Sequence, residues 1–236
     1  MEYNYESYME NIPSNVEISG DRYTYNGVNV PRVTEILSAM WYSEGLMHWA
    51  NSLGYKKQSY TKVRDEAANT GTIAHDSIEY FLKTGKDPDI QNAKSLNAYC
   101  AFKEWYSMLQ KNGHTTEVLG MEEKLTCPWF GGTYDLLLNI DDKLCLIDFK
   151  TSNHISEKYY MQIAAYKYML ALKNITPVYA IILQLDKNAP VYYEYMIDFS
   201  NQDHSTYMQY ALQSFFLICS AYYNRLYLEN NIGMMR

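Results

Sequence analysis

Two apolar runs separated by two aspartates constrain the fold of this chain more than any other feature of its sequence. Residues 133–140 and 143–149 are rich in leucine and isoleucine, and Asp141-Asp142 lies between them. Apolar runs of this length joined by two turn residues predict a β-hairpin. If the turn closes symmetrically, Asp135 lies directly opposite Asp148 on the paired strands. A three- or five-residue loop would shift the pairing by one residue, so this register depends on the turn.

Two facing carboxylates within leucine-rich strands need a compensating cation. Like charges directly opposite each other destabilise a sheet by roughly 0.2–1 kcal/mol. A bound Mg²⁺ or Mn²⁺ ion would remove this repulsion between Asp135 and Asp148. Strand alternation places Lys150 on the same face as Asp148 and sends Phe149 to the other face, into the core.

The face that carries Asp135, Asp148 and Lys150 has the groups that metal-dependent phosphodiester cleavage uses. Carboxylates hold the metal, and a lysine can orient the attacking water or the scissile phosphate. The alternative is an ordinary strand-end ion pair between Asp148 and Lys150, with Asp135 as a turn residue.

Further short motifs lie on either side of this hairpin. Gly71-Thr-Ile-Ala-His75 falls within a predicted helix, where a histidine without function is the alternative. Gly132 precedes Asp135 by three residues. Gln162 and Tyr166 are four residues apart, so they share one face of a predicted helix, where a buried amide–tyrosine pair is the alternative.

The order of these motifs resembles that of the PD-(D/E)XK nuclease superfamily, and within it the RecB-like branch that includes phage exonucleases and the mitochondrial genome maintenance exonuclease. The family's G-x-x-x-H helix, G-x-x-D strand, D-x-K strand followed by Thr-Ser, and Q-x-x-x-Y helix are matched in sequence between Gly71 and Tyr166. The segment Val30–Leu37 is similar to the P-S-V-T-x-I-L segment of phage and mitochondrial members, with Arg32 in place of serine. The resemblance covers residues from about 25 to 170.

The resemblance implies roles for individual residues. The implied metal-binding residues are His75, Asp135, Asp148 and Phe149. The implied catalytic residues are Asp135, Asp148, Lys150, Gln162 and Tyr166. Gln162 is expected to position water, Lys150 or phosphate.

Three acidic residues stay open as additional members of the site. The family usually carries one more carboxylate on the strand before G-x-x-D, and Glu122 or Glu123 would fill this place. Neighbouring strand residues point to opposite faces, so only one of them can reach the site. Glu79, one turn after His75, would support the imidazole or be a solvated helix charge.

By the same resemblance, the chain is expected to be a Mg²⁺- or Mn²⁺-dependent deoxyribonuclease, an exonuclease on single-stranded DNA or free DNA ends. It would serve phage replication, recombination or host DNA degradation. We expect it to be a monomer that works with a replication or recombination protein. The alternatives are a structure-specific or restriction-type endonuclease, and a catalytically silent DNA-binding or assembly subunit with the same fold.

The net charge of −7 is unusual for a DNA-binding protein, because affinity for DNA comes largely from Lys and Arg contacts with phosphate. Residues 56–64 form a local basic and aromatic stretch that would guide a strand towards the metal, or form a solvated helix face. Trp41, Tyr42 and Tyr60 are the rings expected to stack on bases.

The four cysteines include no C-x-x-C pair, so neither zinc nor an iron–sulfur cluster is expected, and free thiols are. No apolar run is long enough to span a bilayer, so no membrane contact is expected. The N-terminus resembles neither a signal nor a transit peptide, which predicts a cytoplasmic protein, in the host cytoplasm if it is phage-encoded.

The predicted fold class is α/β: a PD-(D/E)XK, restriction-endonuclease-like core with a mixed central sheet flanked by helices and a helical N-terminal elaboration. A flexible tail over 1–15 precedes a single domain over 16–236, with a helical part at about 31–112, the catalytic sheet at about 115–200 and a terminal helix at about 200–229. Predicted helices cover about 33–40, 44–53, 58–84, 92–112, 156–172 and 200–229. Predicted strands cover about 16–19, 22–30, 116–126, 130–140, 143–149, 178–186 and 190–197.

Overall fold

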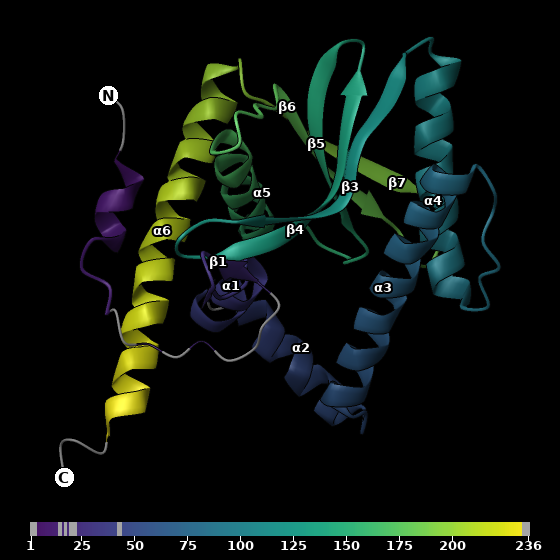
Figure 1. The fold of residues 1–236 in the computed structure, drawn as a ribbon. Helices are drawn as coiled ribbons and strands as arrows, with labels where there is room; N and C mark the ends of the chain where they lie inside the picture. Colours follow the sequence, from purple (N-terminus) through teal and green to yellow (C-terminus); the bar gives the residue numbers. More distant parts are fainter. Residues whose placement is uncertain (1–3, 14–15, 17, 19–22, 42–43, 233–236) are drawn as a thin grey trace.

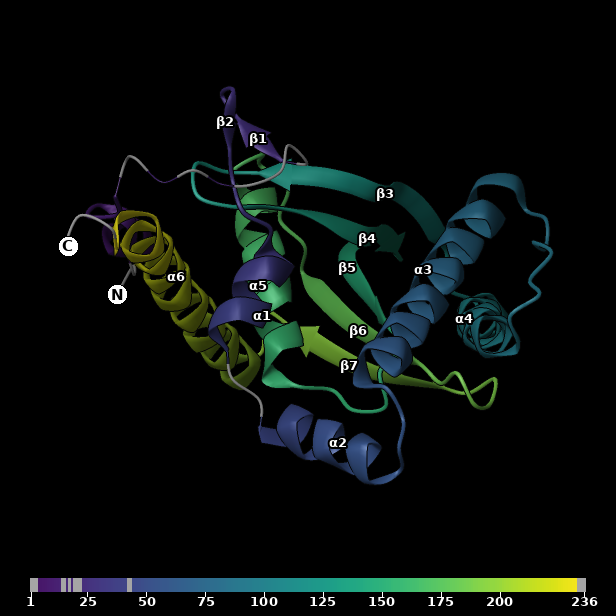
Figure 2. The same cartoon turned by 90° about the horizontal axis from the view of Figure 1, so that it is seen from below.

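A five-stranded mixed sheet lies between two layers of helices (Figures 1 and 2). The computed structural model describes residues 4–13, 16, 18, 23–41 and 44–232. The helices are η1 (Tyr5–Met9, a 3₁₀ helix), α1 (Val33–Met40), α2 (Glu44–Tyr55), α3 (Tyr60–Thr84), α4 (Ala93–Lys111), α5 (Glu157–Ala171) and α6 (Gln202–Asn231). The strands are β1 (Thr24–Tyr25), β2 (Val28–Asn29), β3 (Thr116–Thr126), β4 (Gly131–Ile140), β5 (Lys143–Lys150), β6 (Tyr179–Leu185) and β7 (Tyr192–Asp198). The predicted fold class, α/β with a mixed central sheet flanked by helices, is confirmed.

Strands β3 to β7 lie side by side in chain order. Neighbouring strands are antiparallel except β5 and β6, which are parallel. A parallel pair needs a long crossover, and α5 supplies it. This crossover carries Gln162 and Tyr166 back over the sheet, next to the strands that bear the two aspartates.

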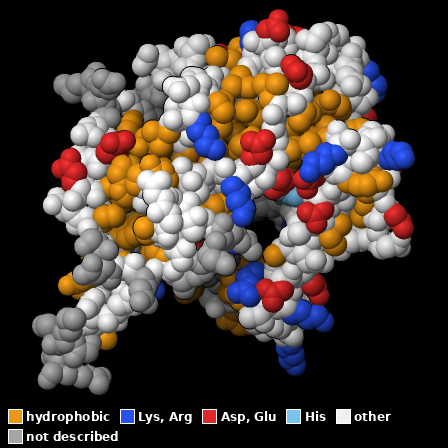
Figure 3. Space-filling model, viewed as in Figure 1, with side chains coloured by type: hydrophobic (Ala, Val, Ile, Leu, Met, Phe, Trp, Pro, Cys, Tyr) orange, Lys and Arg blue, Asp and Glu red, His pale blue; other side chains and the backbone are white. Residues whose placement is uncertain are grey.

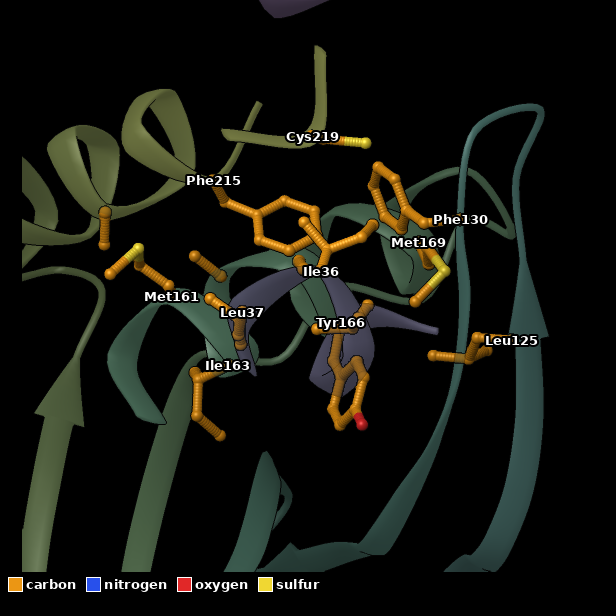
Figure 4. Close-up of a cluster of buried hydrophobic side chains, with 14 of the residues drawn as sticks. Ile36, Leu37, Leu125, Phe130, Met161, Ile163, Tyr166, Met169, Phe215 and Cys219 are labelled. Carbon is orange, nitrogen blue, oxygen red and sulfur yellow. The ribbon is translucent and has the colours of Figure 1, made fainter. Parts of the chain in front are cut away.

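Each face of the sheet has its own hydrophobic core. Helices α3 and α4 cover one face, where Phe102 and Trp105 are fully buried against β5 and β6 side chains. Helices α1, α5 and α6 cover the other face, around Phe130 and Phe215. Tyr166 lies at the edge of this second core with its hydroxyl group pointing away from the apolar cluster (Figure 4). Within the described residues, no helix is both long and apolar enough to cross a membrane.

The hairpin of β4 and β5 forms as the sequence predicts. Ile140 pairs with Lys143, and the two turn residues Asp141 and Asp142 both have positive φ, 49° and 60°. This is the backbone of a two-residue type I′ turn, which aspartate tolerates. The Asp141 carboxylate also accepts a hydrogen bond from the main-chain N–H of Thr115 at 2.9 Å, which fixes the turn against the preceding strand.

The register of this hairpin also follows the prediction. The paired positions run inward to Leu136 and Ile147 without a shift. The next positions along the two strands are Asp135 and Asp148. The tight turn therefore brings the two carboxylates to the same end of the sheet.

Two motif glycines lie where helices approach the sheet closely. A Cβ at Gly132 would lie 2.5 Å from Cε1 of Tyr166, so the α5 tyrosine rests directly on the β4 backbone. A Cβ at Gly71 would lie 3.3 Å from Oγ1 of Thr151, where α3 passes the end of β5. The glycines of G-x-x-D and G-x-x-x-H thus set the distance between the sheet and two helices.

The N-terminal part differs from the prediction. A single strand was predicted over 22–30, but β1 and β2 both lie inside that segment and pair with each other. The reason is the Asn26-Gly27 turn, whose two positive φ angles form a type I′ hairpin. The strand predicted at 16–19 lies partly outside the described residues, and Val16 and Ile18 belong to no strand.

The segment expected to be a tail contains a packed element. Within Tyr5–Met9, Met9 is buried and Tyr5 stacks on Phe216 of α6 with ring centroids 5.8 Å apart. Tyr8 accepts a hydrogen bond from Gln213 at 2.9 Å. Apolar rings every few residues give this short segment enough surface to bury.

The contact at Gly132 predicts a specific cost of adding one methyl group. Gly132→Ala should lower the free energy of unfolding by about 1–3 kcal/mol, because Tyr166 cannot move away without disturbing the core. Gly54→Ala is the matched control: no heavy atom lies within 4 Å of its added Cβ in α2, so stability should stay the same or rise by up to about 1 kcal/mol. Urea unfolding followed by circular dichroism measures both. Equal effects of the two substitutions would contradict the close packing of α5 on β4.

Candidate metal and catalytic site

Three metal-ligating side chains from three elements meet at the end of the sheet. His75 comes from α3, Glu122 from β3 and Asp135 from β4. His75 Nδ1 lies 3.4 Å from Oδ1 of Asp135 and 3.7 Å from Oε1 of Glu122. One donor atom from each residue lies within 4.8 Å of the other two, an arrangement that can hold a metal ion.

Glu122 reaches this group through an unusual backbone conformation. Its φ of 49° lies in the left-handed region, although it stands in the middle of a strand. Its neighbours Met121 and Glu123 keep their pairing with Leu136 and Tyr134, so Glu122 stands opposite Asp135. A non-glycine residue held in this region stores roughly 1–3 kcal/mol of strain.

The structure distinguishes between the two glutamates, Glu122 and Glu123, that the sequence could not tell apart. Glu122 lies beside His75, whereas Glu123 accepts a hydrogen bond from the Tyr134 hydroxyl at 2.8 Å. Glu79, the third open residue, is ion-paired with Lys83 one turn later on α3. This is the arrangement expected for a solvated helix charge.

Asp148 is a buried carboxylate with too few hydrogen-bond donors. Its side chain is 1% exposed, and Oδ1 has no hydrogen-bond partner among the described residues. Lys150 forms an ion pair with Oδ2, so the negative charge of Asp148 is balanced, although Oδ1 still lacks a hydrogen-bond donor. Burial raises the pKa of Asp148 to about 6, with Lys150 lowering it and Asp135 raising it further.

Lys150 is held between carboxylates and an aromatic ring. Burial acts to lower its pKa, but the charges of Asp148 and Asp135 outweigh this, so its pKa is raised. Its Nζ lies 4.9 Å from the ring centroid of Tyr159 on α5. Because the lysine stays protonated, it can act as a fixed positive charge.

Asp135 and His75 stabilise each other's charged form. Burial acts to raise the pKa of Asp135, but His75, Lys150 and the Phe149 N–H outweigh it, so its pKa is lowered. Burial acts to lower the pKa of His75, yet Asp135 and Glu122 raise it to about 10. Without a metal, the proton on His75 therefore neutralises part of the carboxylate charge.

Phe149 supports the site through its main chain. Its N–H donates to Oδ2 of Asp135 at 2.6 Å. Its ring faces the α3–α4 side, edge-on to Phe102 and to His75. Its carbonyl oxygen is the group through which it would bind a metal, and this predicted role stays a prediction.

Gln162 and Tyr166 form a buried pair. Nε2 of Gln162 donates to the Tyr166 hydroxyl at 3.0 Å. Burial raises the pKa of Tyr166 well above its usual value, and the nearby Asp148 and Asp135 charges raise it further. The contact matches the alternative interpretation of this motif, and a role of Gln162 in positioning water or phosphate stays a prediction.

The donor set fits a divalent cation. His75, Glu122 and Asp135 offer one nitrogen and two carboxylates that lie close enough to share an ion. Asp148 is not one of this group, but its buried Oδ1 has no hydrogen-bond partner among the described residues. Carboxylates suit both Mg²⁺ and Mn²⁺, whereas an imidazole ligand is better suited to Mn²⁺.

The surface around the site is mixed in charge. Figure 3 shows this face hollowed between α3 and the body of the molecule, with acidic and basic side chains around the hollow. The basic stretch 56–64 begins at the end of α2 and continues into α3, and most of its residues are exposed.

The aromatic residues expected to contact DNA have different surroundings. Trp41 Nε1 donates to Glu157 at 2.9 Å, and Tyr60 packs edge-on against Trp49. Tyr42 lies outside the described residues. All four cysteines are free thiols, as predicted, and Cys127, Cys145 and Cys219 are buried.

The sequence interpretation missed two residues next to the site. Tyr159 lies under Lys150 and shares a helix face with Gln162 and Tyr166, so the spacing of three and four residues along α5 could have identified it. Thr151 packs against α3 at Gly71, and nothing in the sequence indicates which helix would lie next to Thr151.

No family model matches this chain, and no curated protein matches it. Two solved structures with some likeness are those of LHK-Exo, an alkaline exonuclease from Laribacter hongkongensis, one of them in complex with dAMP. The dAMP complex is 14% identical, with a TM-score of 0.38, and the match covers 88% of this chain and 95% of that one. The other structure is 13% identical, with a TM-score of 0.37 and the same coverage. Likeness at this level supports no conclusion about activity, so function is inferred from the side chains of the site.

The raised pKa of His75 predicts that metal binding is coupled to proton release. A metal must displace the proton that His75 holds below about pH 10, so Mn²⁺ affinity should increase about tenfold from pH 7 to pH 8. Isothermal titration of MnCl₂ in two buffers of different ionisation enthalpy measures the number of protons released.

Two variants test the source of this proton. His75→Gln should bind Mn²⁺ more weakly and without proton release in this pH range. Glu123→Gln should behave as the wild type, because Glu123 is bonded to Tyr134. Wild-type affinity that does not change with pH would rule out His75 as a ligand.

Proposed function

We propose that this protein is a divalent-metal-dependent nuclease that hydrolyses phosphodiester bonds in DNA, acting as an exonuclease on single strands or free ends. One observation carries the proposal: the His75, Glu122 and Asp135 side chains converge beside the buried Asp148–Lys150 pair. Carboxylates, an imidazole and a charged lysine at one end of a sheet are groups that can support metal-assisted phosphodiester hydrolysis.

Each group has a distinct task in this proposal. His75, Glu122, Asp135 and Asp148 would hold the metal. A divalent cation bound there supplies positive charge that stabilises a negatively charged phosphate and makes water a better nucleophile. The Asp148 carboxylate, whose pKa is about 6, would be kept ionised by that positive charge.

Lys150 would contribute a second positive charge. Its ammonium group is fixed between Asp148 and the Tyr159 ring, so it loses little freedom when a phosphate or a water molecule binds. A preorganised charge of this kind stabilises negative charge that develops during the reaction.

The preference for an exonuclease rests on the motifs of the sequence. The G-x-x-x-H helix and the Q-x-x-x-Y helix resemble the RecB-like exonucleases more than restriction-type endonucleases. In the structure these two motifs pack against the strands that bear the two aspartates, through Gly71 to Thr151 and through Tyr166 to Gly132.

Substitution of two residues tests the assignment of the site. Lys150→Ala and Asp135→Asn should each reduce cleavage at least about 100-fold, because Lys150 supplies a positive charge for the reacting phosphate and Asp135 supplies a carboxylate that holds the metal. Lys143→Ala is the matched control, since Lys143 is exposed at the opposite end of the same strand and should leave the rate unchanged. Circular dichroism and thermal unfolding confirm that each variant folds. Full activity of both site variants would refute the site.

The activity itself is tested with two DNA substrates. End-labelled linear and closed circular single-stranded DNA are incubated with the protein and Mn²⁺, Mg²⁺ or EDTA. Metal-dependent loss of the linear DNA alone is the expected result. Cleavage of circles would replace the exonuclease by an endonuclease, and no cleavage with either metal would overturn the proposal.

A further inference from the structure

An open hollow lies beside β5, the strand that bears Asp148 and Lys150, over the ends of β6 and β7. It has a volume of about 320 Å³. Its walls include the aromatic side chains Tyr193 and Tyr195 and the amide side chains Asn153, Gln184 and Asn188. This combination of rings and amides is not used by the candidate metal site.

Strand register places the hollow next to Lys150. Lys150 pairs with Gln184 on β6, and Gln184 pairs with Tyr193 on β7. Asp148 pairs in the same way with Ile182, and Ile182 with Tyr195. Cross-strand partners share a face of the sheet, so the two tyrosines stand on the face that bears Asp148 and Lys150, two strand spacings or about 10 Å away.

Hydrogen bonds fasten the hollow to the loop that follows Lys150. Gln184 Nε2 donates to the carbonyl of Ser152 at 2.7 Å, and the Tyr195 hydroxyl donates to Oε1 of Gln184 at 3.2 Å. Lys187 donates to the carbonyl of Thr151 at 3.2 Å. The residues after the catalytic lysine and the walls of the hollow are therefore one connected structure.

Both tyrosine side chains are exposed to solvent. Tyr193 is 52% exposed and Tyr195 is 37% exposed, on the strand β7 that forms one edge of the sheet. Tyr160 of α5 and Tyr207 of α6 extend the aromatic surface, with ring centroids 5.2 Å apart. Charge at the rim is balanced, because Lys187 lies next to Asp186, whose carboxylate accepts the N–H of Asn188.

We propose that this hollow binds an unpaired base of a single-stranded DNA substrate, close to the phosphate that is cleaved. The inference rests on the proposed function, since it names the form of DNA that the site accepts. Bases stack on exposed tyrosine rings whatever their sequence, and amide groups can bond to their edges. A base within a duplex must first be unstacked and unpaired before it can enter, which disfavours its binding.

Binding without cleavage tests the subsite in the unaltered protein. The probe is a fluorescein-labelled oligothymidylate of about 12 nucleotides, titrated in EDTA and followed by anisotropy. It is compared with the same strand containing abasic positions and with the corresponding duplex. The intact single strand should bind at least about fivefold more tightly than either, and equal affinity for all three would overturn the proposal.

Single substitutions identify the rings responsible. Tyr193→Ala and Tyr195→Ala should each weaken binding of the oligothymidylate by about 5- to 100-fold, the range for loss of one stacked base. Tyr195→Phe keeps the ring and loses only the hydroxyl, so it should retain most of the affinity. Tyr227→Ala removes a tyrosine of similar exposure from the far end of α6, about 30 Å along the helix from Tyr207, and should have no effect.

The same experiments separate this inference from the proposed nuclease activity. Lys150→Ala should lose cleavage and keep its preference for intact over abasic strands. A wild-type protein that cleaves DNA while Tyr193→Ala and Tyr195→Ala bind like the wild type would overturn the subsite and leave the nuclease assignment intact. A protein that does not cleave but loses the preference for bases in these variants would overturn the nuclease assignment and retain the subsite.

Discussion

The burial of one carboxylate governs the arrangement of this end of the molecule. Asp148 is almost fully enclosed, and a carboxylate without water or hydrogen-bond donors is costly unless a cation accompanies it. Lys150, two residues further along the strand, provides that cation. Strand alternation makes the pair possible, because both side chains emerge from the same face. The strand must therefore keep its register up to its last residue, and the tight turn at Asp141-Asp142 fixes it.

The two helices that enclose this pair are positioned by close contacts at two glycines, which have no side chain to hold the elements apart. Tyr166 of α5 packs where Gly132 leaves space on β4, and α3 passes Thr151 where it carries Gly71. These contacts determine how far His75 and Gln162 stand from the strands. The two motifs that contain glycine, G-x-x-x-H and G-x-x-D, therefore determine how the helices pack as well as supplying a side chain to the site.

Much of this arrangement could be predicted from the sequence because it depends on local patterns. The hairpin register follows from two apolar runs and a two-residue turn, and the helix that bears Gln162 follows from its periodicity. Glu122 could not be assigned, because its side-chain direction depends on a left-handed backbone that strand alternation does not anticipate. The hairpin within 22–30 was missed because the Asn26-Gly27 turn was not recognised as the stronger local preference. The spacing of Gln162 and Tyr166 anticipated their contact along α5, whereas the packing of Tyr166 on Gly132 of β4 depends on tertiary structure that this spacing does not specify.

The left-handed conformation of Glu122 has a consequence for the evolution of this chain. Glycine adopts that conformation without strain, so replacement of Glu122 by glycine would relax the strand while deleting the carboxylate next to His75. Most substitutions lower the stability of a protein. Replacement of Glu122 by glycine differs, because it would remove the strain of the left-handed backbone. Glu122 therefore places a carboxylate next to His75 at a cost in the stability of the strand.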